Sequence, residues 1–271
     1  GIAGSCVRLS DCIDVLVERC IAHSAIYHGL FAVDGCRRIK FSNNKIYNCG
    51  YRAMHFNGVD GAGNDITDCV FDDNECWSNG QASDNTTNGG IFIALGVAAR
   101  ISCQRNMVKD DARVGIEVTG TGSGASTPAR EVIIAGNIIS GCPEGIRTGN
   151  SLTDCLITKN IISGATSIGL ALGVMIGCRV TGNIVRRSAM AGKFGLSSSN
   201  ALVCVALNDN TFDDNDAETG QKAVVFINTG AHVACQINGN MFVNNGVTGA
   251  SVACAIVMGD PASDRSKSLQ I

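Results

Sequence analysis

The stretch VIIAGNII at Val132–Ile139 is followed, 23 residues later, by CLITKNII at Cys155–Ile162. In both, two apolar residues stand two positions apart, and Asn stands three positions after the second of them. A third apolar residue stands two positions after that Asn. A short unit that returns many times along one chain is the signature of a repeat architecture. The same pattern recurs from residue 39 to residue 242, and its asparagines are Asn44, Asn74, Asn106, Asn137, Asn160, Asn183, Asn210 and Asn240.

The copies of this unit start 23 to 32 residues apart, so the unit stays constant while the loops between copies vary in length. Apolar residues alternate within each copy, and a further alternating stretch follows a small residue, as at Gly115-Ile116 and Gly145-Ile146. Because a period of two is typical of β-strands, we predict three short strands per unit. Stacked units of this kind predict an all-β chain folded as a right-handed parallel β-helix solenoid, of about nine complete rungs.

The repeated asparagines are expected to be structural. We predict that each lies at a bend between two strands, where Asn tolerates left-handed backbone geometry. Stacked amide side chains can also hydrogen-bond to one another from rung to rung, which predicts an Asn ladder.

The composition supports a large folded core and excludes several classes of function. The 271 residues are 45% hydrophobic and 17% charged, which provides enough apolar material for a core and excludes a disordered chain. The net charge is −3 and the Lys and Arg residues are scattered, so we expect no nucleic-acid partner. No apolar run approaches the roughly 18 residues that a membrane helix needs, so we expect no membrane partner.

The 14 cysteines form no Cys-x-x-Cys pair, and we predict that most are reduced, buried thiols that act as small apolar residues. Reduced thiols indicate folding in a reducing cytoplasm, and secretion or association with a virion would then follow folding. Four cysteines share one slot of the repeat and should be buried together, namely Cys69, Cys155, Cys178 and Cys235.

We expect one β-helix domain over residues 1–271, with a polar C-terminal tail at residues 259–271. Residues 6–9 resemble the third strand of an earlier rung, and no capping helix precedes them. A strand stack that is open at its end would template aggregation. We therefore predict that the chain is a fragment of a longer protein.

The Asn-anchored repeat, over residues 6 to about 258, resembles the pectate-lyase-like superfamily of right-handed parallel β-helices. That superfamily includes polysaccharide lyases, glycoside hydrolases, alginate epimerases and phage tailspike depolymerases. The resemblance implies a polysaccharide substrate and, in the phage branch, a homotrimer. The Asp-Pro-His motif of the epimerases is absent, because the only Asp-Pro pair, Asp260-Pro261, is followed by Ala262.

Polar and aromatic residues converge on the outward positions of the third strand in the first five rungs. The register predicts that Glu117 neighbours Arg147 and that His55 lies two rungs, roughly 10 Å, from Glu117. The predicted catalytic residues are His55, Glu117, Glu144 and Arg147. The predicted substrate-binding residues are Tyr27, His28, Tyr51, Arg52, Asp60, Trp77 and Phe92.

Two mechanisms of polysaccharide cleavage suit these residues. A hydrolase would use the carboxyl groups of Glu117 and Glu144 on the two sides of the scissile bond. A lyase would instead use a base beside a uronate and a cation that neutralises the uronate carboxylate, for which the histidines and arginines are candidates.

Other interpretations of the same residues remain open. Glu117 and Arg147 could form a plain surface salt bridge, and the whole column could be the solvated face of a non-catalytic glycan-binding or structural shaft. A uronan C5-epimerase is a minor alternative. We predict no cofactor and no metal site: calcium is conceivable at Asp72-Asp73, Asp110-Asp111 and Asp213-Asp214, but these pairs are expected to be solvated turn residues.

Overall fold

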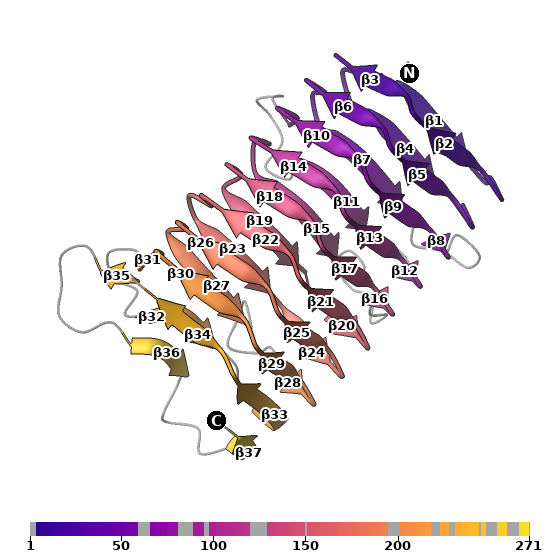
Figure 1. The fold of residues 1–271 in the computed structure, drawn as a ribbon. Coiled ribbons are helices and arrows are strands. Elements are labelled where there is room, and N and C mark those ends of the chain that lie inside the picture. The colour runs from indigo at the N-terminus through magenta and orange to yellow at the C-terminus, as the bar shows by residue number, and fades with distance from the viewer. Residues whose placement is uncertain are drawn as a thin grey trace.

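The structure is a computed structural model. It describes residues 4–58, 66–80, 89–94, 98–119, 129–149, 151–194, 201–217, 223–227, 231–243, 245–247, 254–258 and 266–270. Within these ranges the chain is built of strands, loops and turns, without a helix that could cross a membrane. The strands stack in parallel rungs from the N-terminal to the C-terminal end (Figure 1). The predicted all-β parallel solenoid is confirmed.

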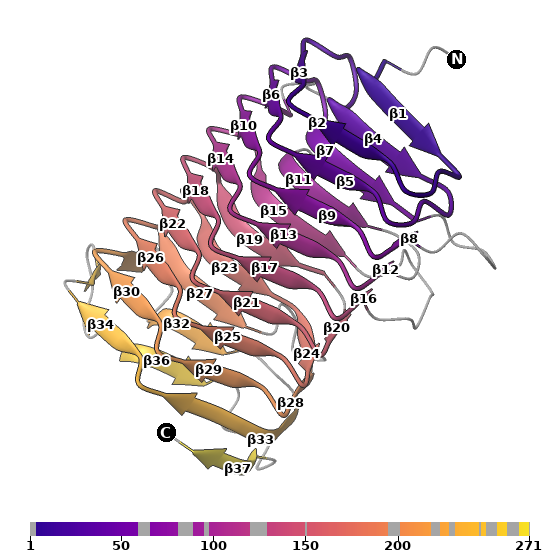
Figure 2. The ribbon, with the colours of Figure 1, turned by 45° about the vertical axis from the view of Figure 1, so that its right-hand side comes forward.

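Three long parallel sheets form the walls of the solenoid (Figure 2). Sheet A contains β1 (Val7–Ser10), β4 (Leu30–Val33), β7 (Arg52–Asn57), β11 (Gly89–Ala94), β15 (Val114–Thr119), β19 (Glu144–Thr148), β23 (Ile168–Leu172), β27 (Met190–Phe194), β32 (Ala223–Ile227) and β36 (Cys254–Met258). Sheet C contains β3 (Ile21–His23), β6 (Lys45–Tyr47), β10 (Glu75–Trp77), β14 (Met107–Lys109), β18 (Ile138–Ser140), β22 (Ile161–Ser163), β26 (Ile184–Arg186), β30 (Thr211–Asp213) and β34 (Met241–Val243).

Sheet B lies between them in chain order and often contains two short strands per rung. One series is β2 (Leu16–Glu18), β5 (Lys40–Ser42), β9 (Val70–Asp72), β13 (Ser102–Gln104), β17 (Ile133–Ala135), β21 (Leu156–Thr158), β25 (Arg179–Thr181), β29 (Ala206–Asn208) and β33 (Ala231–Asn238). The other is β8 (Ile66–Thr67), β12 (Ala98–Ala99), β16 (Ala129–Arg130), β20 (Ser151–Thr153), β24 (Val174–Ile176) and β28 (Ala201–Val203).

The structure therefore differs from the expectation of three strands per rung. Each rung that begins at β7, β11, β15, β19, β23 or β27 has a fourth short strand, and a residue with positive φ, such as Asp154 at 53°, separates the two strands of sheet B. Rungs with the full set of strands are fewer than the nine expected, because the rungs that begin at β1 and β4 have only one strand each in sheet B among the described residues. In the rung that begins at β32, the one long strand β33 pairs with both β28 and β29. Residues 266–270 of the expected tail form β37 (Ser266–Gln270), which pairs with β33. The short β31 (Asp216–Ala217) pairs with β35 (Gly246–Val247).

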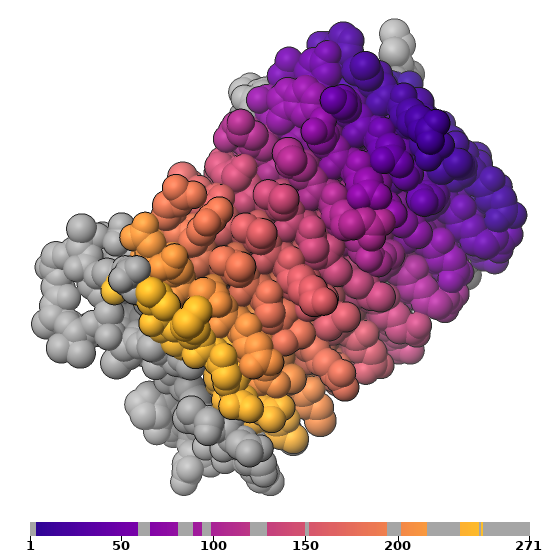
Figure 3. Space-filling model, viewed as in Figure 1, coloured from indigo at the N-terminus to yellow at the C-terminus, as the bar shows by residue number. Residues whose placement is uncertain are grey.

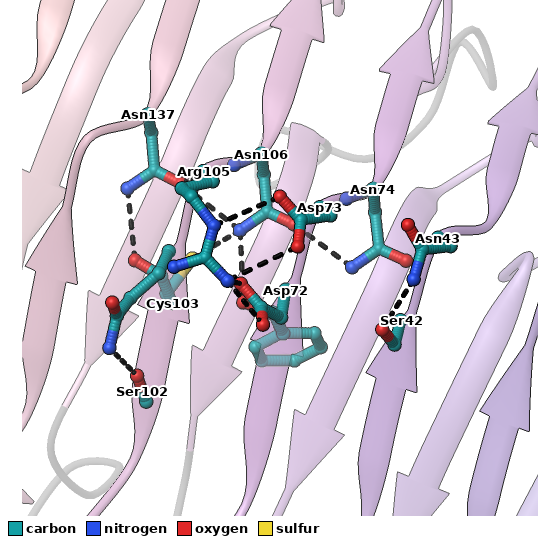
Figure 4. A network of polar contacts seen from close by, with 12 residues as sticks. Ser42, Asn43, Asp72, Asp73, Asn74, Ser102, Cys103, Arg105, Asn106 and Asn137 are labelled. Atoms are coloured by element: carbon teal, nitrogen blue, oxygen red, sulfur yellow. Dashed lines mark hydrogen bonds and ion pairs between the residues drawn. The ribbon is translucent and has the colours of Figure 1, made fainter.

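The predicted Asn ladder is present and buried at the corner between sheets B and C (Figure 4). The Asn74 amide donates to Oδ1 of Asn106 at 2.9 Å, and the Asn106 amide donates to Oδ1 of Asn137 at 3.0 Å. Each Oδ1 also accepts the backbone N–H of the preceding ladder residue, as between Asn74 N and Asn106 Oδ1 at 3.0 Å. The side chains thus satisfy the backbone where the strands bend.

The reason expected for Asn at this bend is only half correct. The left-handed residue is the one before each ladder Asn, such as Arg105 with φ of 50° and Lys159 with φ of 54°. The ladder asparagines themselves are therefore selected for hydrogen bonding and not for backbone conformation. Arg105 projects from its bend and pairs with Asp72 and Asp73 (Figure 4).

The interior of the solenoid is apolar. Phe41, Phe56 and Phe71 form a stacked group, with the rings of Phe56 and Phe71 4.0 Å apart. The four cysteines of the shared slot are buried, as predicted, and the described cysteines are free thiols. Cys6, Cys20 and Cys204 are exposed. Successive rungs cross the surface as parallel bands of colour (Figure 3), so the outward columns of side chains run along the solenoid axis.

Candidate functional site

The candidate site is the outward column of sheet A in its N-terminal half. The register pairs Phe31 with His55, His55 with Phe92, Phe92 with Glu117, and Glu117 with Arg147. The two positional predictions are therefore confirmed: Glu117 neighbours Arg147, and His55 lies two rungs from Glu117. Each residue is placed by the alternation of its strand, which turns its neighbours on both sides into the core.

Burial distinguishes this column from an ordinary solvated strand face. His55, Phe92 and Glu117 are each 8% exposed and Arg52 is 5% exposed. By contrast, Ile138, on the outward face of sheet C, is 44% exposed. Charged residues are almost never buried to this extent unless they are paired, so the charges in this column must be satisfied by one another.

A network of four charged side chains provides this pairing. Nη1 of Arg52 lies 3.5 Å from Oε2 of Glu117, and Nε of Arg147 lies 3.9 Å from Oε1 of Glu117. Nη1 of Arg147 also contacts Glu144 at 3.4 Å. The guanidinium carbon of Arg52 stands 3.1 Å from the centre of the Phe92 ring, a cation–π contact. Arg147 thus bridges two carboxylates, while Arg52 holds the far side of Glu117.

Burial dominates the protonation of this network. The pKa of Glu117 is raised, because the cost of burying a carboxylate exceeds the opposing effect of the arginines Arg52, Arg147 and Arg113. The pKa of Arg52 is lowered to about 9, again because of burial. A carboxyl group with a raised pKa retains its proton at higher pH than an ordinary Glu, which is the property of a general acid.

The two histidines of the site form a pair that the sequence did not predict. Nε2 of His28 lies 3.4 Å from Nδ1 of His55, and the two ring centres are 4.7 Å apart. Aromatic rings of Phe31, Tyr51 and Phe92 surround the pair. Among the described residues, the remaining nitrogens, Nδ1 of His28 and Nε2 of His55, are buried without a hydrogen-bond partner.

Both histidines are neutral at neutral pH. Burial lowers the pKa of His28 to about 4, with a smaller contribution from the charge of Arg52. Burial also lowers the pKa of His55 well below its usual value, and Arg52 and His28 add to this effect. The site therefore contains two neutral imidazoles beside two arginines and two glutamates.

Not every predicted site residue belongs to this column. Tyr27 and Tyr51 lie just before β4 and β7, with ring centres 4.9 Å apart, and Tyr27 is 41% exposed. Trp77 lies instead on β10 of sheet C, stacked on Tyr47 with ring centres 4.6 Å apart. Asp60 lies outside the described residues.

The predicted solvation of the paired aspartates is wrong for Asp111. This residue is 1% exposed, and its Oδ1 accepts the backbone N–H of Asn79 while its Oδ2 is buried without a partner. It lies at the corner between sheets C and A, in a position that the preceding rung fills with Asn79 and two later rungs fill with Asn215 and Asn245. Burial raises the pKa of Asp111 to about 7.

The donor set does not assemble a metal centre in the part of the chain that the structure describes. There, no three His, Cys, Asp or Glu side chains form a group that could hold a metal ion. The His28–His55 pair supplies two nitrogens, which is fewer than three donors.

A family model described as "Periplasmic copper-binding protein (NosD)" matches residues 78–254. The matched span covers more than half of the chain and includes Phe92, Glu117, Glu144 and Arg147. His28, Arg52 and His55 precede it. No curated protein and no solved structure matches the chain. The match agrees with a right-handed parallel β-helix but does not single out the pectate-lyase branch.

Proposed function

We propose, from the premise that this chain belongs to the NosD family of parallel β-helix proteins, that it cleaves a polysaccharide by hydrolysis on the outward column of sheet A. The observation that carries this proposal is the pair of carboxyl groups, Glu117 and Glu144, held by one guanidinium, that of Arg147. Hydrolysis of a glycosidic bond requires two such groups on the two sides of the bond.

The environments of the two carboxyl groups suggest different roles. Glu117 is the more deeply buried, and its pKa is raised, so it would protonate the leaving oxygen as the general acid. The Glu144 side chain is 17% exposed and contacts Nη1 of Arg147, so it would act as the base that activates water. Because both contact the same guanidinium, their oxygens lie within roughly 10 Å of each other, a range that includes the separations of retaining and of inverting enzymes.

The aromatic residues at and beside the N-terminal end of the column would bind sugar rings of the substrate. Tyr27, Tyr51 and Phe31 keep part of their surface exposed there, and aromatic faces supply large contact areas in binding sites. Arg147, with a side chain 29% exposed, offers a cation to an acidic sugar. We therefore propose a bacterial or acidic glycan as the substrate.

The test is incubation with a panel of capsular, lipopolysaccharide and uronate glycans, with assays for new reducing ends and for ultraviolet absorbance of unsaturated uronates. If the protein hydrolyses a glycan, the assays should detect new reducing ends without absorbance. The Glu117→Gln and Glu144→Gln variants should no longer produce these reducing ends. Glu18→Gln, a change on the outward face of sheet B, is the matched control and should cleave normally. Absorbance together with new reducing ends would indicate a lyase reaction and contradict hydrolysis.

A second candidate is glycan binding without cleavage. The ion pairs favour it, because Arg52 and Arg147 already engage the carboxylate of Glu117. A binding protein would retain the glycan without producing reducing ends, and its affinity would survive Glu117→Gln.

Copper, which the family description names, is not part of this proposal. Within the ranges that the structure describes, the residues do not fit a copper centre, because no three His, Cys, Asp or Glu side chains form a group that could hold a metal ion. The pair of His28 and His55 also lies before the matched residues 78–254. No step of the proposed reaction therefore passes through copper.

A further inference from the structure

A second aromatic column lies on the outward face of sheet C. The register pairs His23 with Tyr47 and Tyr47 with Trp77. The rings of Tyr47 and Trp77 are almost parallel, at 10°, and those of His23 and Tyr47 at 9°. The three rings therefore form one continuous stack along three rungs.

The stack ends at Trp77. The next residue in register is Lys109 of β14, so the indole face turned away from Tyr47 has no aromatic neighbour among the described residues. An open cleft of about 260 Å³ lies over the paired strands β10 and β14. It is lined by Glu75, Cys76, Trp77, Met107, Lys109 and Asp110.

The charges around this cleft balance. Nζ of Lys45 lies 3.2 Å from Glu75, and Nζ of Lys109 lies 3.8 Å from Asp110. Two opposite pairs give no net charge that would attract an ion, but they supply hydrogen-bond donors and acceptors beside an apolar floor. Met107, which is 42% exposed, forms part of that floor.

We propose that this cleft binds one uncharged pyranose ring, stacked on the free face of Trp77, with hydroxyl groups bonded to Lys109 and Asp110. The cleft is smaller than the pockets of about 300–1,000 Å³ that hold drug-sized ligands, and so fits a single ring. The inference rests on the proposed glycan function, to which it adds a subsite on a different sheet from the carboxylates.

The single Trp of the chain makes the test direct. The intact protein is titrated with methyl glycosides of glucose, galactose and N-acetylglucosamine, and with methyl glucuronide, while the indole emission is recorded. The proposal predicts a saturable change with at least one uncharged glycoside. No saturable change with any of the four probes would overturn it, and so would a response to the glucuronide alone.

Two variants separate this proposal from the function of sheet A. Calorimetry should show that Trp77→Ala weakens binding of the responding glycoside by about tenfold, whereas Trp77→Phe, which preserves the ring stack, retains most of the affinity. Glu117→Gln should leave the fluorescence titration unchanged. A protein that binds the glycoside but cleaves no glycan would contradict the proposed hydrolysis alone, and a cleaving protein with unaltered indole emission would contradict this subsite alone.

Discussion

At the scale of single residues, the buried acids and bases set the pH behaviour of the protein. Asp111 occupies a position that three other rungs fill with Asn, and its pKa is raised from 3.8 to about 7 by burial. Because the folded state binds the proton more tightly, stability contributed by this group falls as the pH rises from about 4 to about 7 and is constant above that range.

Asp111→Asn should therefore stabilise the protein at pH 8, by an amount of the order of a few kcal/mol. The amide can still accept from Asn79, and it carries no charge to bury. The measurement is urea denaturation of both proteins at pH 4 and pH 8. The difference in unfolding free energy should be small at pH 4 and large at pH 8, and an equal difference at both values would contradict the assignment.

Arg147 tunes the acid of the proposed reaction. Its charge lowers the pKa of Glu117 against the raising effect of burial, so Arg147→Met should raise that pKa further. The basic limb of the pH profile of kcat/KM would then move to higher pH, because the acid retains its proton longer. A basic limb that stays in place would show that Glu117 is not the group that titrates.

The histidine pair shows what the sequence could and could not predict at this scale. Alternation placed His55 on the outward face correctly, because the side-chain period of a strand is fixed. The contact of His28 with His55 depends on the orientation of side chains in two adjacent rungs, which no repeat pattern contains. Strand alternation also could not predict the burial of this column. It distinguishes side chains that point inward from those that point outward, but it does not distinguish outward side chains that are covered from those that are exposed to solvent.

At the scale of elements, the Asn ladder joins one rung to the next. Asn137 donates to the backbone carbonyl of Cys103 and to Oδ1 of Asn160, and its own Oδ1 accepts two further hydrogen bonds from Asn106. Removing a buried side chain of this kind leaves several backbone and amide groups unsatisfied, each at about 1–3 kcal/mol.

Asn137→Ala should therefore lower the unfolding free energy by several kcal/mol, to be measured by urea denaturation. Asn48→Gly is the matched control, since Asn48 is exposed, lies outside the ladder and has a positive φ of 54°, which Gly adopts freely. The control should change stability by less than about 1 kcal/mol. Equal losses in both variants would contradict a special role for the ladder.

The strands and the aromatic stack also differ in how far the sequence predicts them. The repeat located the strands that flank each Asn, because the apolar alternation is strongest there. The short strands β8, β12 and β16 have two residues each, too few for a periodic signal. The stack on sheet C is contained in the repeat, because Tyr47 and Trp77 both stand three positions after a ladder Asn and therefore share one outward column.

At the scale of the whole molecule, the buried cysteines report on the integrity of the solenoid. Burial raises the pKa of Cys69 to about 12 and that of Cys142 to about 12, so these thiols are unreactive in the folded protein. A thiol reagent at pH 7 should label few cysteines before unfolding, with Cys6, Cys20 and Cys204 first, and nearly all 14 after unfolding. Few labelled thiols in the unfolded protein would indicate disulfides instead.

The central claim is that the outward column of sheet A cleaves a glycan with Glu117 as the acid. The most direct measurement follows a glycan that the wild-type protein cleaves, with calorimetric binding and reducing-end release recorded on the same Glu117→Gln sample. Because Gln keeps the shape of the side chain and loses the proton, the account predicts that binding persists within a few-fold while cleavage falls by about 10²-fold or more. Cleavage at the wild-type rate in Glu117→Gln would contradict the account.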